Sequence, residues 1–173
     1  KRYHLILLAK NNTGYKNLIK IVSAAHLEGF YYKPRVDKDF LRKNSEGLIA
    51  LSACLGGELS RAIASKNWKK AKKVALEHEE IFGKGNYYIE LQQHPNIEDQ
   101  NFVTPQLVKL AKETGIPIVA TQDSHYTHTD DAHAHDVLLA VQTGNKLDDI
   151  DRLSMKEDNF ALLHGQEMYD KFK

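Results

Sequence analysis

Apolar residues in this chain form short continuous runs, separated by longer stretches in which they recur at helical spacing. The short runs predict four strands, at Tyr3–Ala9, Gly47–Ser52, Asn86–Gln92 and Ile116–Ala120. The longer stretches predict helices from Asn11, Asn12 or Thr13 to Gly29, then at Asp37–Arg42, two turns from Glu58, Trp68–Phe82, Glu98–Thr114, Asp130–Gln142 and Gln166–Phe172. A strand followed by a helix four times predicts an α/β fold with a parallel sheet and right-handed crossovers.

The last of these strands carries the strongest chemical signal. Its five residues, Ile116–Ala120, are mostly apolar and predict a strand buried on both faces. Asp123 and His125 follow two residues apart, and on an extended segment they point to the same side. In α/β folds, ligands bind at the carboxyl ends of strands, so this pair is a candidate for metal binding. The alternative is that Asp123 caps the next helix and His125 is a solvated loop residue.

Size and composition fit one soluble domain of 173 residues, with 42% apolar and 27% charged residues. The sequence contains no apolar run long enough for a membrane span and no leader pattern. Cys54 is the only cysteine, which excludes an internal disulfide and predicts a reducing, cytoplasmic location. The net charge of +1 indicates no global attraction to nucleic acid, and a lysine cluster between Lys66 and Lys73 is interpreted as a solvated helix face.

Two further residues occupy positions near strand ends. His4 stands at the start of the first strand and Cys54 directly follows the second. If the strand ends gather at one rim, both side chains join Asp123 and His125 in a donor set that suits zinc, or manganese or iron if carboxylates dominate. The alternatives are a core histidine for His4 and a small buried hydrophobic residue for Cys54.

The remaining candidates are weaker. His94 follows the third strand, and Glu90 and Gln92 lie on one face of it. His133 and His135 fall on the helix after the fourth strand, where packing or capping is the simpler interpretation. Gly56-Gly57 is either a tight turn or a phosphate-holding helix start. The sequence has no Walker loop, dinucleotide fingerprint, Gly-x-Ser-x-Gly or paired CxxC motif.

Six segments together resemble one family. They are Tyr3–Lys10, Gly14–Lys20, Leu27–Arg35, Gly47–Glu58, Ala120–Tyr126 and Ala134–Gly144. In this order they resemble the PHP (polymerase and histidinol phosphatase) domain of bacterial DNA polymerase III alpha subunits. The resemblance covers nearly the whole chain.

The resemblance implies a fold and a chemistry. The fold is a distorted (β/α)7 barrel of parallel strands with alternating helices, present here in part. Active members hold metal ions at the barrel rim and hydrolyse phosphoesters, which supports 3′–5′ exonuclease proofreading in some bacterial polymerases. His4, Cys54, Asp123 and His125 fall on the family's metal-ligand positions, with Asp123 and His125 in catalytic roles. The family's first ligands, including a His-x-His motif, would lie before Lys1.

Lys33 and Arg35 lie in the Phe30–Arg35 loop and are candidates to hold a substrate phosphate. The alternative is a solvated loop.

Three functions remain open. The chain is part of a metal-dependent nuclease domain acting on the 3′ end of DNA, a non-catalytic scaffold that stabilises the polymerase and docks replisome partners, or a free-standing phosphatase.

The opening Lys1-Arg2, without an initiator methionine, favours a piece of a longer protein. We expect residues 1–144 to be the C-terminal part of the PHP barrel and residues 145–173 to be a polar tail leading toward the polymerase core. DNA-directed polymerase activity would belong to the parent chain, since no polymerase palm is present. The fragment alone is expected to be inactive, with no membrane association.

Overall fold

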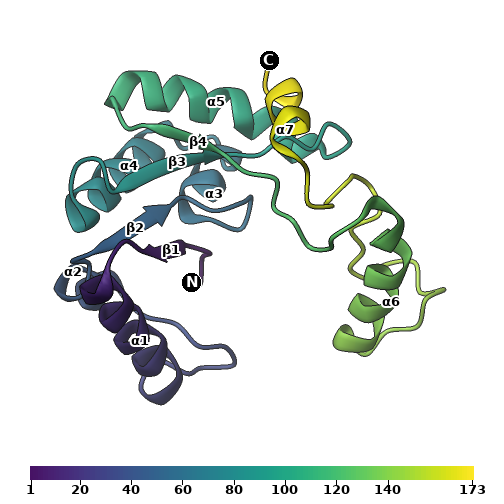
Figure 1. Ribbon diagram of the computed structural model, residues 1–173, viewed down its shortest axis with the longest axis horizontal. Helices are drawn as coiled ribbons and strands as arrows, with labels where there is room; N and C mark the ends of the chain where they lie inside the picture. Colours follow the sequence, from purple (N-terminus) through teal and green to yellow (C-terminus); the bar gives the residue numbers. More distant parts are fainter. The chain divides into compact units, whose positions relative to one another are not determined.

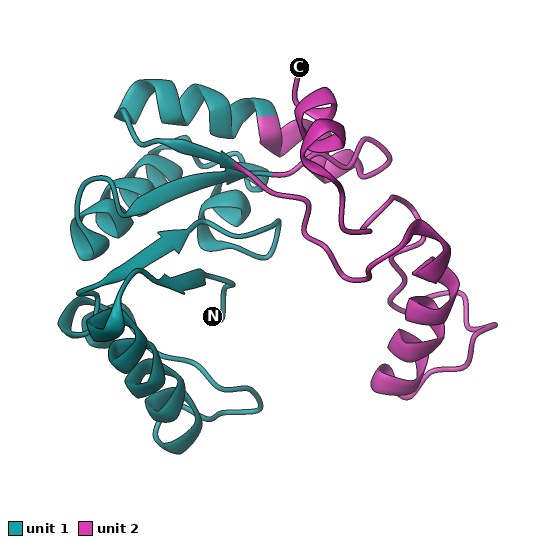
Figure 2. Cartoon of the chain, viewed as in Figure 1, with its two compact units in different colours: residues 1–91, 105–119 teal, residues 92–104, 120–173 magenta.

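A four-stranded sheet joins segments from residue 6 to residue 120 of the chain (Figure 1). The computed structural model describes all residues from 1 to 173, which form two compact units (Figure 2). Unit 1 comprises residues 1–91 and 105–119, and unit 2 comprises residues 92–104 and 120–173. The strands are adjacent in chain order, and they are β1 (Ile6–Ala9), β2 (Leu48–Leu51), β3 (Tyr87–Leu91) and β4 (Ile118–Ala120).

The direction of β1 differs from the prediction. β1 runs antiparallel to β2, with Ile6 opposite Leu51 and Ala9 opposite Leu48, whereas β2 and β3 are parallel. The expectation of an all-parallel sheet is therefore wrong at β1. The reason is that two helices rather than one connect β1 to β2. They return the chain to Gly47, whose carbonyl accepts from the Lys10 N–H at 2.8 Å, so β2 starts beside the end of β1.

The burial of β4 also differs from the prediction. Ile116 is buried, but Ile118 is 40% exposed and Ala120 is exposed as well. β4 is an outer strand of the sheet, so it has a strand neighbour on one side only. The backbone N–H of Ile89 in β3 donates to Pro117 at 2.9 Å, just before β4 begins. The apolar run thus marks a strand at the sheet edge and not one buried on both faces.

The helices of unit 1 agree closely with the sequence pattern. They are α1 (Asn12–Leu27), α2 (Lys38–Lys43), α3 (Glu58–Ala64), α4 (Trp68–Phe82) and the C-terminal part of α5 (Glu98–Thr114). Asn11 caps α1 by accepting from the Gly14 N–H at 2.9 Å, and Asp37 caps α2 in the same way. The core between helices and sheet is apolar and includes Leu48, Ala50, Leu59, Ala71, Ala75, Ile89, Leu107 and Leu110.

Unit 2 contains the short 3₁₀-helix η1 (Thr129–Asp131), α6 (Ala132–Thr143) and α7 (Gly165–Lys171), so both helices predicted here are confirmed. Gly144 ends α6 in the left-handed conformation. Asp136 of α6 is 1% exposed, and Arg152 donates to both of its carboxylate oxygens at 2.7 and 2.6 Å. Ser154 and Lys156 add a hydrogen bond and an ion pair to the same carboxylate. These contacts fasten residues 145–156 to α6.

None of the helices combines the length and the apolar character that crossing a bilayer requires.

The first turn of α1 packs directly on the loop before β2. A Cβ atom added at Gly14 would lie 1.8 Å from the Gly47 carbonyl oxygen. Gly14→Ala therefore forces α1 away from β2, and we expect a loss of about 2–3 kcal/mol in the free energy of unfolding measured with urea. Ser23→Ala on the exposed side of α1 is the control and should leave stability unchanged. Equal stabilities for the two variants would contradict this packing.

The Asp136 cluster predicts an acid-sensitive stability. The Arg152 guanidinium, with Lys156 and Ser154, holds the pKa of the Asp136 carboxyl well below its ordinary value. The stabilisation is therefore complete above the unfolded-state pKa of about 3.9 and is lost as the pH falls below it. Asp136→Asn should be less stable than wild type at about pH 7 in urea unfolding, and the gap should narrow toward about pH 3. A gap that stays constant over this range would contradict the pairing.

Candidate metal centre

His4 and Cys54 meet at one end of the sheet in unit 1. Because β1 is antiparallel to β2, the start of β1 and the end of β2 lie at the same end of the sheet. His4 precedes β1 and forms an isolated parallel bridge with Gly57, and its N–H donates to the Gly56 carbonyl at 3.1 Å. In a parallel pair the two residues would have lain at opposite ends. The antiparallel direction of β1 therefore brings His4 and Cys54 to the same end of the sheet.

The separation of the two side chains suits a shared metal ion. Cys54 Sγ lies 3.6 Å from His4 Nδ1. With a Zn–N bond of about 2.05 Å, a Zn–S bond of about 2.3 Å and a tetrahedral angle, the two ligand atoms lie about 3.6 Å apart. His4 is exposed and Cys54 half-buried, so an ion can reach both. A thiolate and an imidazole at this spacing fit two ligands of a zinc ion.

The turn between β2 and α3 fixes this approach. A Cβ at Gly56 would lie 2.7 Å from His4 Nδ1, and one at Gly57 would lie 2.2 Å from the Ser52 carbonyl oxygen. Ala53, directly before Cys54, has a φ of 63°, in the left-handed region. Both glycines are therefore required by close packing. This favours the tight-turn interpretation of Gly56-Gly57 over a phosphate-holding helix start.

Asp123 and His125 lie together in unit 2, but not on an extended segment. Asp123 has a φ of 56°, so the chain turns there, and the prediction of an extended segment is wrong. The His125 Nδ1–H donates to the backbone carbonyl of Asp123 at 2.6 Å. A carbonyl oxygen only accepts, so Nδ1 carries the proton and Nε2 is left with a lone pair for a ligand. Asp123 does not cap a helix, since His128 and Asp131 occupy the N-caps of η1 and α6.

His94 is the candidate whose surroundings are most unusual. Its side chain is 2% exposed, and neither ring nitrogen has a hydrogen-bond partner. The ring stacks on Phe160 with centroids 4.2 Å apart, and Nδ1 lies 3.7 Å from an Asp158 carboxylate oxygen. Burial lowers the pKa of His94, Lys171 lowers it further, and Asp158 and Asp123 oppose this. The net effect on the pKa favours the neutral form of the imidazole.

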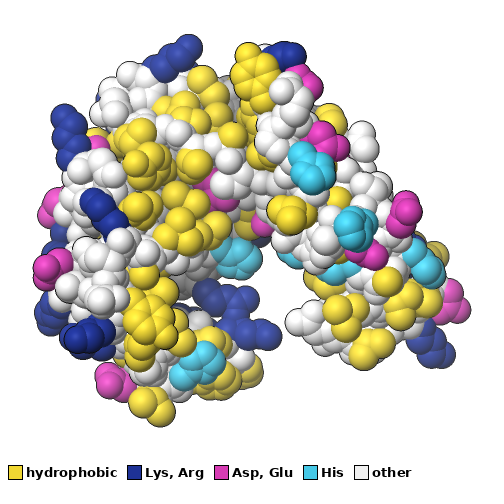
Figure 3. Space-filling model, in the orientation of Figure 1, with side chains coloured by type: hydrophobic (Ala, Val, Ile, Leu, Met, Phe, Trp, Pro, Cys, Tyr) yellow, Lys and Arg dark blue, Asp and Glu magenta, His cyan; other side chains and the backbone are white.

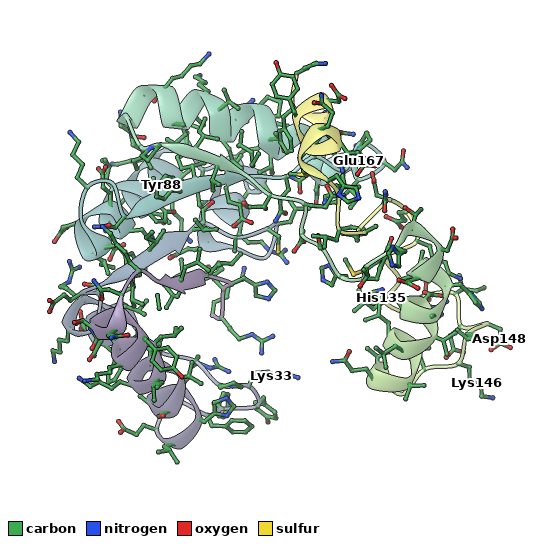
Figure 4. All side chains as sticks on the ribbon, in the orientation of Figure 1. Lys33, Tyr88, His135, Lys146, Asp148 and Glu167 are labelled. Atoms are coloured by element: carbon green, nitrogen blue, oxygen red, sulfur yellow. The ribbon has the colours of Figure 1, made fainter.

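The other second-tier residues take structural positions. Glu90 and Gln92 are buried; the Glu90 N–H donates to Ser52 Oγ at 2.9 Å, and the Gln92 side-chain amide donates to Thr121 at 3.3 Å. His135 projects from α6 with its ring centroid 5.6 Å from that of His125 (Figure 4). Histidine side chains are conspicuous on the surface of unit 2 in Figure 3. His133 is exposed.

The two basic candidates in the Phe30–Arg35 loop differ from each other. The Arg35 guanidinium donates to the backbone carbonyls of Tyr31 and Lys33 and lies 5.5 Å from the Tyr31 ring centroid. Arg35 thus holds the loop in shape. Lys33 is exposed and reaches away from the loop (Figure 4), so its ammonium group is the more accessible cation.

The four predicted ligands therefore form two pairs, one in each unit. His4 and Cys54 belong to unit 1, and Asp123 and His125 belong to unit 2. Within each unit, no group of three or more His, Cys, Asp or Glu side chains is arranged to hold a metal ion. Each pair supplies two ligands at most. Sequence reasoning missed Phe160, whose ring meets that of His125, because this contact joins distant segments of the chain.

Comparison with known proteins agrees with the resemblance described above. The PHP domain family matches residues 1–94. Proteins named DNA polymerase III subunit alpha are 48% identical over 170 residues in Borreliella burgdorferi, 43% over 170 in Treponema pallidum and 43% over 166 in Thermus aquaticus. These alignments cover 98%, 98% and 96% of this chain, but only 15%, 14% and 13% of the relatives. The chain spans about a seventh of the length of these relatives.

Gly56 offers a test of the His4–Cys54 pair that leaves both ligands in place. A methyl group at position 56 meets the His4 ring, so Gly56→Ala should move the imidazole away from Cys54. We expect the affinity for Co²⁺, followed by thiolate-to-cobalt charge-transfer absorption, to fall about tenfold or more. Gly165→Ala is the matched control, because a Cβ there meets nothing within 4 Å. Equal cobalt affinity in both variants would contradict a shared ion.

Proposed function

The chain belongs to the PHP domain family, and on that premise we propose that it is part of the PHP domain of a bacterial replicative DNA polymerase. In the complete protein this domain hydrolyses phosphoesters with the help of metal ions, and its substrate is a mismatched 3′ end of DNA. Similarity to polymerase III alpha subunits along almost the whole chain supports the polymerase assignment. Nucleotidyl transfer itself belongs to other parts of the longer protein.

The observation that carries the proposal is the 3.6 Å contact between His4 Nδ1 and Cys54 Sγ. Under the proposal, His4, Cys54, Asp123 and His125 are metal ligands, and further ligands come from other segments of the complete protein. The thiolate and imidazoles favour zinc, and manganese or iron are the alternatives. A bound divalent ion supplies Lewis-acid activation of water and neutralises charge on the phosphate.

The residues of this chain orient and hold the reacting groups. His125 presents Nε2 because its Nδ1–H is engaged by the Asp123 carbonyl. The Asp123 carboxylate is then available to bridge or to orient a water molecule. Lys33 neutralises a phosphate of the DNA backbone, and Arg35 supports it by shaping the loop. The partners are DNA, the polymerase core of the same chain and other replisome subunits, in the cytoplasm.

A second function, a non-catalytic scaffold, is favoured by one observation. The side chains of Tyr15, Ile19 and Val22 lie along one face of α1 and are between 50% and 58% exposed. Hydrophobic side chains lie at the surface of this part of unit 1 in Figure 3. An apolar helix face of this kind suits packing against another part of the polymerase.

The two functions separate in an assay of the complete polymerase. Asp123→Ala together with His125→Ala removes one ligand pair, so metal-dependent 3′–5′ exonuclease activity on a mismatched primer should fall at least about 100-fold. Polymerase activity on a matched primer should remain. His26→Ala on α1 is the control, since this histidine is exposed and distant in sequence from either pair.

Unchanged removal of mismatched ends by the double variant would rule out the nuclease function. If wild type contains no metal and shows no exonuclease activity, the scaffold function is favoured instead.

A further inference from the structure

Residues 158–162, which we call the clasp, pair with the turn that carries Asp123 and His125. The His125 N–H donates to the Phe160 carbonyl at 2.9 Å, and the Leu162 N–H donates to the Tyr126 carbonyl at 3.0 Å. Tyr126 and Ala161 form an isolated parallel bridge. The clasp therefore adds a strand-like backbone contact on both sides of His125, although more than 30 residues separate the two segments.

Side chains strengthen this pairing. The Phe160 N–H donates to the Tyr126 hydroxyl at 2.9 Å, and the Gln122 amide donates to the Asn159 carbonyl at 2.8 Å. The Lys171 ammonium group of α7 donates to the side-chain oxygen of Gln122 at 2.8 Å. The clasp and α7 thus hold the turn at Gln122 and Tyr126, the residues directly before and after the segment from Asp123 to His125.

Phe160 is the centre of the clasp. It is 4% exposed, and its ring contacts two histidines. His94 stacks on it with an interplanar angle of 22°, and His125 meets it edge to face with centroids 5.6 Å apart and an angle of 89°. Phe160 thus provides a fixed apolar wall for the His125 imidazole, and buried His94 packs on the same ring.

The clasp is itself anchored to the segment after β3. An Asp158 carboxylate oxygen accepts from the Asn96 N–H at 3.0 Å, and the Asn96 side chain donates to the Glu157 carbonyl at 2.8 Å. The same carboxylate faces His94 at 3.7 Å. The wall beside His125 therefore has an anchor besides the turn that it supports.

We propose that the clasp positions His125, with Phe160 as the positioning residue, and that it belongs to the functional domain. It holds the ring so that Nδ1–H meets the Asp123 carbonyl and Nε2 is presented as a ligand. This inference rests on the proposed metal-dependent function and deepens it. It also moves the functional boundary from residue 144, expected from the sequence, to Leu162.

Phe160→Leu keeps an apolar side chain in the buried site but removes the ring that contacts His125. In ¹⁵N NMR of the 173-residue protein without metal, at alkaline pH where an ordinary imidazole is neutral, wild-type His125 should show one tautomer, protonated at Nδ1. The signal is assigned by its loss in His125→Gln. Phe160→Leu should show exchange between both tautomers. In the complete polymerase, the same variant should lower zinc affinity about 10–100-fold in chelator competition.

Leu162→Ala is the matched control in the clasp, because the side chain is 65% exposed and the backbone N–H is kept. It should retain the single tautomer and the zinc affinity. Phe160→Tyr keeps an aromatic ring at this position, so this variant should retain the single Nδ1–H tautomer of His125.

A single Nδ1–H tautomer in Phe160→Leu would overturn the positioning role. The tautomer is measured without metal, so it is independent of the proposed function. A wild type that binds neither zinc, manganese nor iron overturns the proposed function, while a tautomer shift in Phe160→Leu still supports the clasp.

Discussion

The antiparallel pairing of β1 with β2 is the constraint on which the site in unit 1 depends. Ile6 pairs with Leu51, and this register brings the residue before β1 next to the turn after β2. A slip by one residue would turn the side chains of β1 to the other face of the sheet. Gly56 then allows the His4 ring to approach the turn closely, and Gly57 allows the turn to pack against the Ser52 carbonyl. The His4–Cys54 contact follows from the direction and register of β1 together with the absence of a Cβ atom at Gly56 and Gly57.

In unit 2, Asp123 and His125 are brought together in a different way. No regular strand carries Asp123 and His125. The hydrogen bond from the His125 ring to the Asp123 carbonyl and the clasp around the turn fix the imidazole. Zinc takes four ligands, so under the proposed metal-binding role each pair needs further ligands from elsewhere. In both pairs the backbone holds the candidate ligands in place, which would lower the entropy lost on binding an ion.

Local signals in the sequence predicted most of the fold. Trp68–Phe82 and Glu98–Thr114 are helices with these bounds. Asn11, one of the three predicted caps, begins α1, and Gly144 ends α6 as predicted. The direction of β1 and the exposure of Ile118 were predicted wrongly, because both depend on how distant segments assemble. The positive φ of Asp123 has no local signal either. Phe160 was recognisable only in the structure, since its stacking on His94 joins residues 66 positions apart.

The outer position of β4 has a practical consequence for handling the protein. An outer strand presents unpaired backbone N–H and carbonyl groups, and Ile118 adds an exposed apolar side chain to this edge. Such an edge is a template for strand addition between molecules. Concentrated solutions of the isolated chain are therefore prone to aggregate through β4, and a charged residue at position 118 is the natural substitution for keeping it monomeric.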